Sequence, residues 1–179
     1  VEESSRWYPG AGLYRPVTLI QTGTCHIDEW GINVETKTYN WNTQEATLTL
    51  GVNIEGDFED KTVRFETNGH TIDVKSEATD CLGASWAGTT LTMEDVEGWT
   101  PETPQLYELT VSILDNSGQV FDKKTVKYGV RTVEVSEDGG FMLNGVSRKI
   151  KGVCLHHDLG MLGAAVNKAA LIRQVELLK

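Results

Sequence analysis

Apolar and polar residues alternate along most of the sequence between Gly23 and Arg131. The clearest run covers residues 47–54, where the apolar positions are Leu48, Leu50, Val52 and Ile54. Successive side chains of a β-strand point to opposite faces, so a period of two indicates a strand with one buried face. This part of the chain is therefore predicted to consist of half-buried β-strands.

Turn residues separate these runs. Asn68-Gly69 lies between alternating runs at residues 63–65 and 72–74. Both residues accept the positive φ of a type I′ turn, which connects antiparallel strands tightly. The run at 109–113 ends in turn residues 115–118, and the strand after it carries Phe121, Val126, Tyr128 and Val130. Neighbouring strands are therefore expected to form antiparallel hairpins.

About seven short strands within roughly a hundred residues are typical of an immunoglobulin-like β-sandwich, so the predicted fold class is all-β. Residues 26–39 and 91–93 supply the remaining strands. The cysteine–tryptophan–cysteine spacing of antibody domains is not present. We therefore expect a core held by side-chain packing alone, with these tryptophans as its large fillers: Trp30, Trp41, Trp86 and Trp99.

The pattern changes after Arg131. A short hairpin is predicted between Val133 and Leu143, and a second Asn-Gly pair follows at residues 144–145. An apolar strand is predicted on the far side, over residues 150–155.

That strand is predicted to end in the polar run His156-His157-Asp158, before a break at Gly160. A helix is predicted over residues 167–179, with Asn167 as its N-cap and an apolar face formed by Leu171, Val175 and Leu178. Strand, polar loop and helix make up the first unit of a βα repeat. In such repeats the functional side chains lie at the C-terminal end of the strand.

The composition is that of a soluble globular protein, with 39% hydrophobic and 23% charged residues in 179. A formal net charge of −10 argues against nucleic acid or an anionic membrane as a partner. No apolar run is long enough to cross a bilayer, and no signal-peptide pattern opens the sequence. The sequence leaves the compartment open between the cytoplasm and an exported or periplasmic location.

The three cysteines, Cys25, Cys81 and Cys154, are scattered and form no C-x-x-C pair, so neither a zinc nor a redox motif is indicated. Cys154 falls in the predicted strand, where a thiol serves as a small hydrophobe. The run at residues 156–158 is compatible with a partial metal site, a solvated loop or a ligand-binding loop. Further ligands at suitable spacing are missing, so we predict no metal and no cofactor.

Separated blocks of the sequence resemble glycoside hydrolase family 2 in the order in which that family has them. Arg6-Trp7-Tyr8-Pro9-Gly10-Ala11-Gly12-Leu13-Tyr14-Arg15 resembles the end of its sugar-binding jelly-roll domain. Trp99-Thr100-Pro101-Glu102-Thr103-Pro104-Gln105-Leu106-Tyr107 resembles the W-x-P-E-x-P-x-L-Y block of its sandwich domain. Residues 128–134, 140–145 and 151–153 resemble the segment of this family that connects the sandwich domain to the catalytic barrel. Within the family, residues 152–167 are most similar to β-galactosidases.

The resemblance implies three domain pieces: residues 1–22 as the end of a jelly roll, 23–132 as the sandwich, and 133–179 as the start of a (β/α)8 barrel. It also implies a parent enzyme that is a retaining exo-β-glycosidase acting on a β-linked galactoside or related glycoside. Such enzymes need two carboxylates about 5 Å apart. In this family both are glutamates on later barrel strands, and no glutamate here matches either motif. We therefore expect no catalytic residue in this chain, which would be an inactive scaffold between jelly roll and barrel.

The resemblance implies one substrate-binding residue. His156 aligns with the histidine of the family's G-V-N-R-H-E strand end, which lines the sugar subsite and stabilises charge in the transition state. The sequence departs from that pattern around it, because Cys154 and Leu155 replace the Asn-Arg pair and His157 replaces the acid.

Two other classes of function are compatible with the residues. One is a stand-alone carbohydrate-binding sandwich with exposed aromatic side chains, and the other is an interaction module whose acidic face binds a partner. A βα start after Gly152 favours the enzyme fragment over both, because a binding sandwich has no use for it. The helix at 167–179 would leave its apolar face uncovered in a fragment, so we expect it either to pack on a neighbour, including a second copy, or to be poorly ordered.

Overall fold

The computed structural model describes residues 12–13, 15–78, 84–154, 156 and 159–179. The chain divides into two compact units. One unit runs from Thr22 to Lys149, and the other combines Ile150–Lys179 with the described residues before Thr22.

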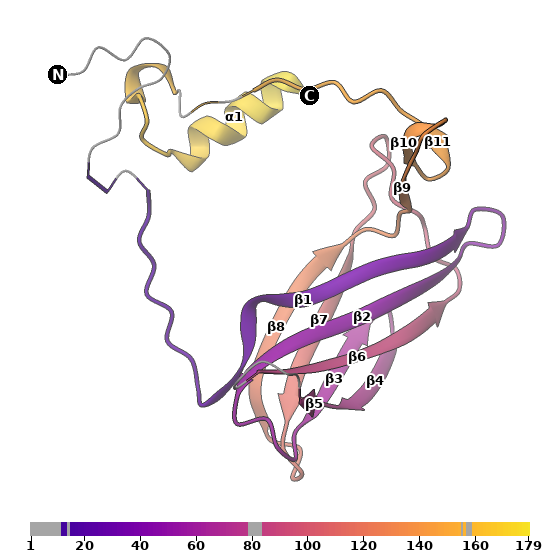
Figure 1. Ribbon diagram of the computed structural model, residues 1–179, viewed down its shortest axis with the longest axis vertical. Helices are drawn as coiled ribbons and strands as arrows, with labels where there is room; N and C mark the ends of the chain where they lie inside the picture. Colours follow the sequence, from indigo (N-terminus) through magenta and orange to yellow (C-terminus); the bar gives the residue numbers. More distant parts are fainter. Residues whose placement is uncertain (1–11, 14, 79–83, 155, 157–158) are drawn as a thin grey trace. The chain divides into compact units, whose positions relative to one another are not determined.

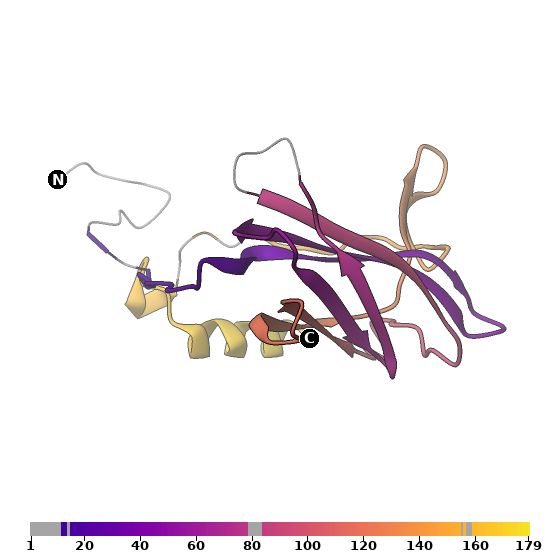
Figure 2. The same cartoon turned by 90° about the horizontal axis from the view of Figure 1, so that it is seen from below.

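Two four-stranded antiparallel sheets form most of the unit Thr22–Lys149 (Figures 1 and 2). Sheet A has the order β1-β2-β6-β5: Cys25–Asn40, Glu45–Gly56, Ala84–Met93 and Glu77–Ala78. Sheet B has the order β4-β3-β7-β8: His70–Lys75, Thr62–Thr67, Tyr107–Leu114 and Val120–Tyr128. The predicted all-β class and the predicted packing of two sheets are confirmed.

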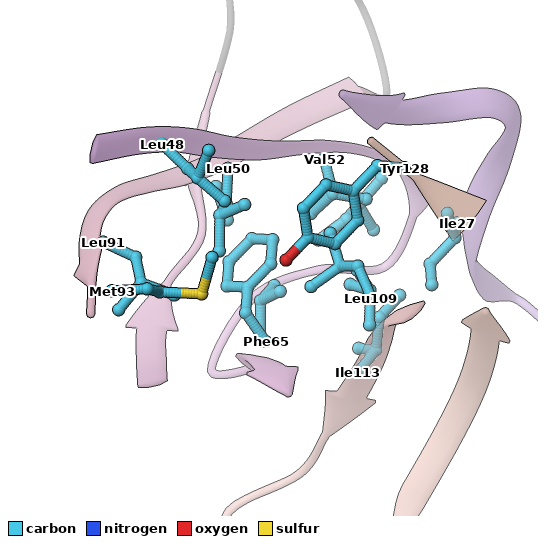
Figure 3. Packing of buried hydrophobic residues seen from close by; sticks show 14 of the residues in the cluster. Ile27, Leu48, Leu50, Val52, Phe65, Leu91, Met93, Leu109, Ile113 and Tyr128 are labelled. Carbon is cyan, nitrogen blue, oxygen red and sulfur yellow. The ribbon is translucent and has the colours of Figure 1, made fainter. Parts of the chain in front are cut away.

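The core lies between the inner faces of the two sheets (Figure 3). The alternation in β2 places its apolar side chains there, all fully buried: Leu48, Leu50, Val52 and Ile54. Phe65 of β3 faces them from sheet B together with Leu109, Val111 and Ile113 of β7. The inward positions of both sheets therefore share one continuous apolar cluster.

The buried tyrosine beside this core is hydrogen-bonded. The Tyr128 hydroxyl lies 2.7 Å from Thr67 Oγ1, which donates to the carbonyl of Glu108 at 2.8 Å. Burial raises the pKa of Tyr128 because the phenolate would be poorly solvated. The tyrosine therefore stays neutral and fixes the end of β8 to β3.

Both Asn-Gly pairs form the predicted tight turns. Asn68 and Gly69 have φ values of 45° and 79°, and they join β3 to β4. Asn144 and Gly145 have φ values of 55° and 72°. They join the last two strands of a three-stranded sheet ordered β11-β10-β9: Val146–Ser147, Gly140–Leu143 and Val133–Ser136.

The prediction that the tryptophans fill the core is wrong. Trp30 is 91% exposed and Trp41 is 45% exposed, while Trp86 and Trp99 are half-buried and lie outside the core cluster. Trp30 occupies a bulge in β1, and Trp86 alternates with the buried residues Ser85 and Ala87, so it points outward. Leucine, isoleucine and valine at alternate positions fill the space instead, with Phe65 as the largest fully buried side chain among the described residues.

The predicted strand at residues 150–155 is not found over its described part, because residues 148–154 carry no regular secondary structure. The strand after Gly145 covers only Val146–Ser147. A strand is held by hydrogen bonds to a neighbour, which an apolar sequence run alone does not provide. Cys154 is accordingly exposed and lies in no strand, whereas Cys25 is buried; both are free thiols, and Cys81 lies outside the described residues.

The predicted helix is confirmed as α1, Lys168–Leu178. Asn167 caps it, because its side chain accepts a hydrogen bond from the Ala170 amide at 3.1 Å. A single 3₁₀ turn precedes it at Gly160–Leu162. None of the residues of α1 is buried, so what covers its apolar face stays a prediction. Within the described residues no helix has the length and apolar character to cross a membrane.

The contrast between Phe65 and Trp30 gives a stability prediction. We expect Phe65→Ala to lower the free energy of unfolding by about 3–5 kcal/mol, because it leaves a cavity between the sheets. Trp30→Ala should change it by no more than about 0.5 kcal/mol, because the indole is exposed. Urea denaturation of both variants measures this, and a larger loss from Trp30→Ala would place the core elsewhere.

Candidate functional site

The predicted substrate-binding residue His156 is exposed, in an irregular segment between Cys154 and the 3₁₀ turn. His157 and Asp158 lie outside the described residues, as do Arg6, Trp7 and Tyr14. Within the described part of the chain, no cluster of three or more His, Cys, Asp or Glu residues is arranged to hold a metal ion. The role of His156 therefore stays a prediction from the resemblance.

A well-built cluster lies elsewhere, where the sandwich meets the hairpin sheet. It comprises five residues from three segments, here called the junction cluster: Trp99, Glu102, Arg131, Asn144 and Arg148. Two tyrosines first hold the loop that contains Trp99. Tyr39 donates its hydroxyl to the Val96 carbonyl at 2.6 Å, and the Tyr107 hydroxyl accepts from the Glu97 amide at 2.8 Å.

Trp99 joins this loop to the segment after β8. Its amide donates to the Val130 carbonyl at 2.7 Å, and the Arg131 guanidinium lies 4.7 Å from the centre of its ring. That distance is typical of a cation–π contact. Gly129 makes the approach possible, because a Cβ there would lie only 2.7 Å from Trp99 Cδ1.

Asn144 connects all three segments. Its side-chain oxygen accepts from the Thr132 amide at 3.0 Å, and its side-chain nitrogen donates to the Trp99 carbonyl at 2.9 Å. The backbone N–H of Asn144 donates to the Thr132 carbonyl at 2.9 Å. The positive φ of the turn is thus only part of its role. One side chain satisfies a donor and an acceptor on two other segments, which fixes the hairpin to the sandwich.

An ion pair adds a second link between the hairpin and the loop. Arg148 donates to both carboxylate oxygens of Glu102, at 3.0 and 3.4 Å. This arrangement holds the pKa of Glu102 below its usual value, mainly through the hydrogen bond from Arg148. The pair is largely exposed, so its strength depends on pH and on salt.

An open hollow of about 440 Å³ lies beside Arg131, between β1 and the end of β8. Apolar Leu106 and Val133 line it next to charged Glu35 and Lys127. Glu35 is the only carboxylate among its described lining residues, and its nearest cation is Lys37 at 2.8 Å. A retaining glycosidase needs two facing carboxylates, so this hollow does not carry that chemistry. The junction cluster joins parts of the molecule and contains no catalytic pair.

The sequence places Glu102 and Arg131 only within motif blocks and gives no sign of Arg148. It also predicts Trp99 as a core filler and Asn144 as a turn residue. The signal that its side chain also bridges two segments is spatial, because Asn144 and Trp99 are 45 residues apart in sequence.

Substitution of Asn144 by aspartate tests the bridge. The variant keeps a residue that tolerates positive φ and keeps the acceptor for Thr132, but it turns an oxygen toward the Trp99 carbonyl. We expect Asn144→Asp to lower the free energy of unfolding by about 1–3 kcal/mol and to speed amide exchange across the hairpin sheet. Asn68→Asp is the matched control, because Asn68 occupies the same turn position with an exposed side chain. Equal effects of the two variants would show that Asn144 acts only in its turn.

The Glu102–Arg148 pair should make stability depend on pH. A carboxyl group whose pKa is lowered in the folded state stabilises that state at pH values above its usual pKa of 4.5. This stabilisation is lost as the pH falls through the lowered pKa. We expect Arg148→Gln to lower the melting temperature at pH 7 and to have a smaller effect near pH 3. Thermal denaturation at both pH values measures the difference. Lys149→Gln is the control, because it removes the same charge from the adjacent exposed position.

The family model of glycosyl hydrolases family 2 matches residues 18–131. A β-galactosidase of Bacteroides ovatus is 35% identical over 194 aligned residues, which cover 99% of this chain and 22% of that protein. A β-glucuronidase of Paenibacillus borealis is 32% identical, with 94% of this chain and 26% of that protein covered. The chain thus spans about a quarter of the length of these relatives or less.

Solved structures give the same result. A family 2 glycosyl hydrolase of Bacteroides cellulosilyticus superposes with a TM-score of 0.75 at 29% identity, covering 97% of this chain and 24% of that one. A β-glycosidase of Bacteroides vulgatus superposes with a TM-score of 0.71 at 33% identity, covering 97% and 22%. Sequence blocks, the family match over more than half of the chain and the shared fold agree, and the chain belongs to glycosyl hydrolases family 2.

Proposed function

We propose that this chain is a non-catalytic scaffold segment of a retaining exo-β-glycosidase of the β-galactosidase type. Its role is to hold a sugar-binding jelly-roll domain against a catalytic barrel. The observation that carries this proposal is the junction cluster, in which three segments of the chain are tied together at the point where the sandwich ends. The coverage of only 22% of the β-galactosidase relative supports a role as one segment of a larger enzyme.

The proposed sandwich type is immunoglobulin-like. Sheet orders of β1-β2-β6-β5 and β4-β3-β7-β8 support it, because immunoglobulin-like domains also divide their strands between two antiparallel sheets in this manner. We assign residues 1–22 to the end of the jelly roll, 23–132 to the sandwich and 133–179 to the start of the barrel. The capped helix α1 after a polar segment supports the last assignment.

The links within the junction cluster support the scaffold role. The hairpin sheet is hydrogen-bonded to the loop at Trp99 and to the segment at Thr132, and it is ion-paired to Glu102. A chain held at three points cannot pivot freely about any one of them. The hairpin sheet itself is therefore held in one orientation on the sandwich, which supports a role as a brace.

The proposed substrate belongs to the whole enzyme and is a β-linked galactoside or a related glycoside. The β-galactosidase and β-glucuronidase relatives support a β-glycoside and leave the two sugars as the alternatives. In the whole enzyme we assign His156 to the sugar subsite, where an imidazole hydrogen bond to a ring hydroxyl strengthens as charge develops.

Turnover of aryl glycosides tests the proposal. We expect the 179-residue chain to hydrolyse neither an aryl β-galactoside nor an aryl β-glucuronide, because it contributes neither of the two carboxylates. The full-length parent should hydrolyse one of them. Hydrolysis by the 179-residue chain would place the catalytic pair within it and would overturn the scaffold role.

Variants of the full-length parent complete the test. His156→Ala should lower kcat/KM about a hundredfold, as expected for the loss of a group that stabilises the transition state. Lys151→Gln is the control, because this residue is exposed and lies five positions before the histidine. Unchanged kinetics in His156→Ala would remove the subsite assignment and leave the scaffold role untouched.

A further inference from the structure

The outer face of sheet A carries a row of side chains on β2, β6 and β5, and the exposed Trp30 in the bulge of β1 stands at the end of this row. The β1 bulge lies between the pairs Ile27–Ile54 and Ile32–Val52, so it stands beside Asn53 of β2. Asn53 is paired with Trp86 of β6, which is in turn paired with Glu77 of β5. We call these residues the aromatic row: Trp30, Asn53, Trp86 and Glu77.

The members of the aromatic row do not belong to the core. Asn53 lies between buried Val52 and Ile54, and Trp86 lies between buried Ser85 and Ala87, so both face outward. Directly paired residues share a face, which places Glu77 on the same side as Trp86. Trp30 is 91% exposed in the bulge, a feature that re-aims side chains.

Trp86 lies along the surface of the sheet and does not stand up from it. A Cβ at Gly51 would lie 1.8 Å from its Cη2 atom, and a Cβ at Gly88 would lie 2.8 Å from its Nε1 atom. These two glycines are paired on β2 and β6, so the indole covers both. Glycine destabilises the interior of a strand. Two paired glycines are therefore expected where an aromatic ring packs directly against the backbone.

A small hollow opens beside the ring. It lies where β6 and β5 of sheet A meet β4 of sheet B and has a volume of about 100 Å³. Its polar lining residues are Lys75 and Glu77, and the others are Val74, Trp86, Ala87 and Gly88. Space of this size takes a few water molecules or a hydroxymethyl group. An indole that lies flat, with hydrogen-bonding groups at its edge, matches the two sides of a pyranose: apolar C–H bonds on one side and hydroxyls around the rim.

The neighbouring positions favour a sugar over a protein as the occupant. The next row of the same face is Asn33, Gly51 and Gly88. The row after it is Glu35, Thr49 and Thr90, and beyond that Thr47 and Thr92 pair their hydroxyls at 3.4 Å. Protein interfaces bury clusters of apolar side chains at their centre, which these threonine rows do not offer.

Charge selects among sugars. Glu77 belongs to the aromatic row and lines the hollow together with Lys75, so the two charges beside Trp86 balance, while the chain carries a formal net charge of −10. The lining of the hollow has no excess of positive charge to attract a uronic acid, so a neutral sugar fits better. The spacing of neighbouring strands is about 4.8 Å, so β1 and β6 are separated by roughly 10 Å, about the length of two linked pyranoses, which places Trp30 and Trp86 under the first and third units of a trisaccharide.

We propose that the aromatic row binds a neutral β-linked oligosaccharide, with one sugar unit on Trp86 and another at Trp30. Asn53 and Glu77 supply hydrogen bonds to the hydroxyls of the unit stacked on Trp86. The site retains a glycan chain on the sandwich and requires neither the scaffold role nor the activity of the parent enzyme.

Titration of the 179-residue chain followed by the indole N–H signals in NMR tests the proposal. β-1,4-Galactotriose should shift the signals of Trp30 and Trp86 in a saturable manner, and the Trp41 signal should stay in place. Methyl β-galactoside should bind about tenfold more weakly, because it reaches only one ring. Methyl β-glucuronide should bind more weakly still, because of its carboxylate.

Trp30→Ala is the decisive variant, because Trp30 is exposed and its removal leaves the fold intact. It should weaken galactotriose binding about tenfold and leave the spectrum of the core unchanged. Trp41→Ala, with the partly exposed Trp41 outside the row, should bind as the wild type does. An unshifted Trp86 signal at millimolar galactotriose, or equal weakening by both variants, overturns the proposal. Sedimentation that shows a dimer abolished by Trp30→Ala, without sugar-dependent shifts, would assign the row to a second copy instead.

Discussion

The apolar contact between two sheets is the constraint from which the other features of this chain follow. Each strand contributes every second residue to the core, as Leu48, Leu50 and Val52 do from β2. Moving one strand by a single residue would expose its whole apolar set, so the pairing register is strongly determined. Once the inward positions are assigned, the outward positions are free to take residues for other reasons.

The two features of functional interest both lie outside that core. At the junction cluster, apolar packing gives way to hydrogen bonds, and Asn144 meets the needs of two other segments at once. A polar link of this kind has one good geometry, whereas apolar contacts tolerate sliding. Apolar packing thus stabilises the sandwich, and the hydrogen bonds of the junction cluster fix the orientation of the hairpin sheet on it. On the outer face of sheet A, Trp86 occupies a place that the core packing does not require.

Local patterns predicted the local features. Alternation predicted β2, Asn-Gly predicted two turns because φ is a property of the dipeptide, and Asn167 predicted the start of α1. The prediction for the tryptophans failed because the hydrophobicity of a side chain does not determine which face of a sheet it occupies. The paired glycines Gly51 and Gly88 leave room for the Trp86 indole on the outer face. The strand at residues 150–155 was misplaced over its described part because an apolar run does not supply a partner strand.

The candidate site was harder to predict than the fold. Asn144 contacts Trp99 and Arg148 contacts Glu102 across 45 and 46 residues, distances over which no local pattern carries information. The pattern of the sequence marks His156 as part of a polar run, but only the family resemblance assigns it to a sugar subsite, since an exposed imidazole has many roles. Contacts between distant segments therefore had to come from the structure.

The Asn-Gly turns are also sites at which the asparagine side chain can deamidate. When the backbone nitrogen of the glycine attacks the side-chain carbonyl of the asparagine, ammonia leaves and a succinimide forms, which water opens to aspartate or isoaspartate. Asparagine is among the residues lost at high temperature for this reason. At Asn68 the product adds one charge to an exposed hairpin tip, whereas at Asn144 it removes the amide that contacts Trp99. Deamidation on storage would thus loosen the contact between the hairpin sheet and the loop at Trp99 while leaving the two packed sheets intact.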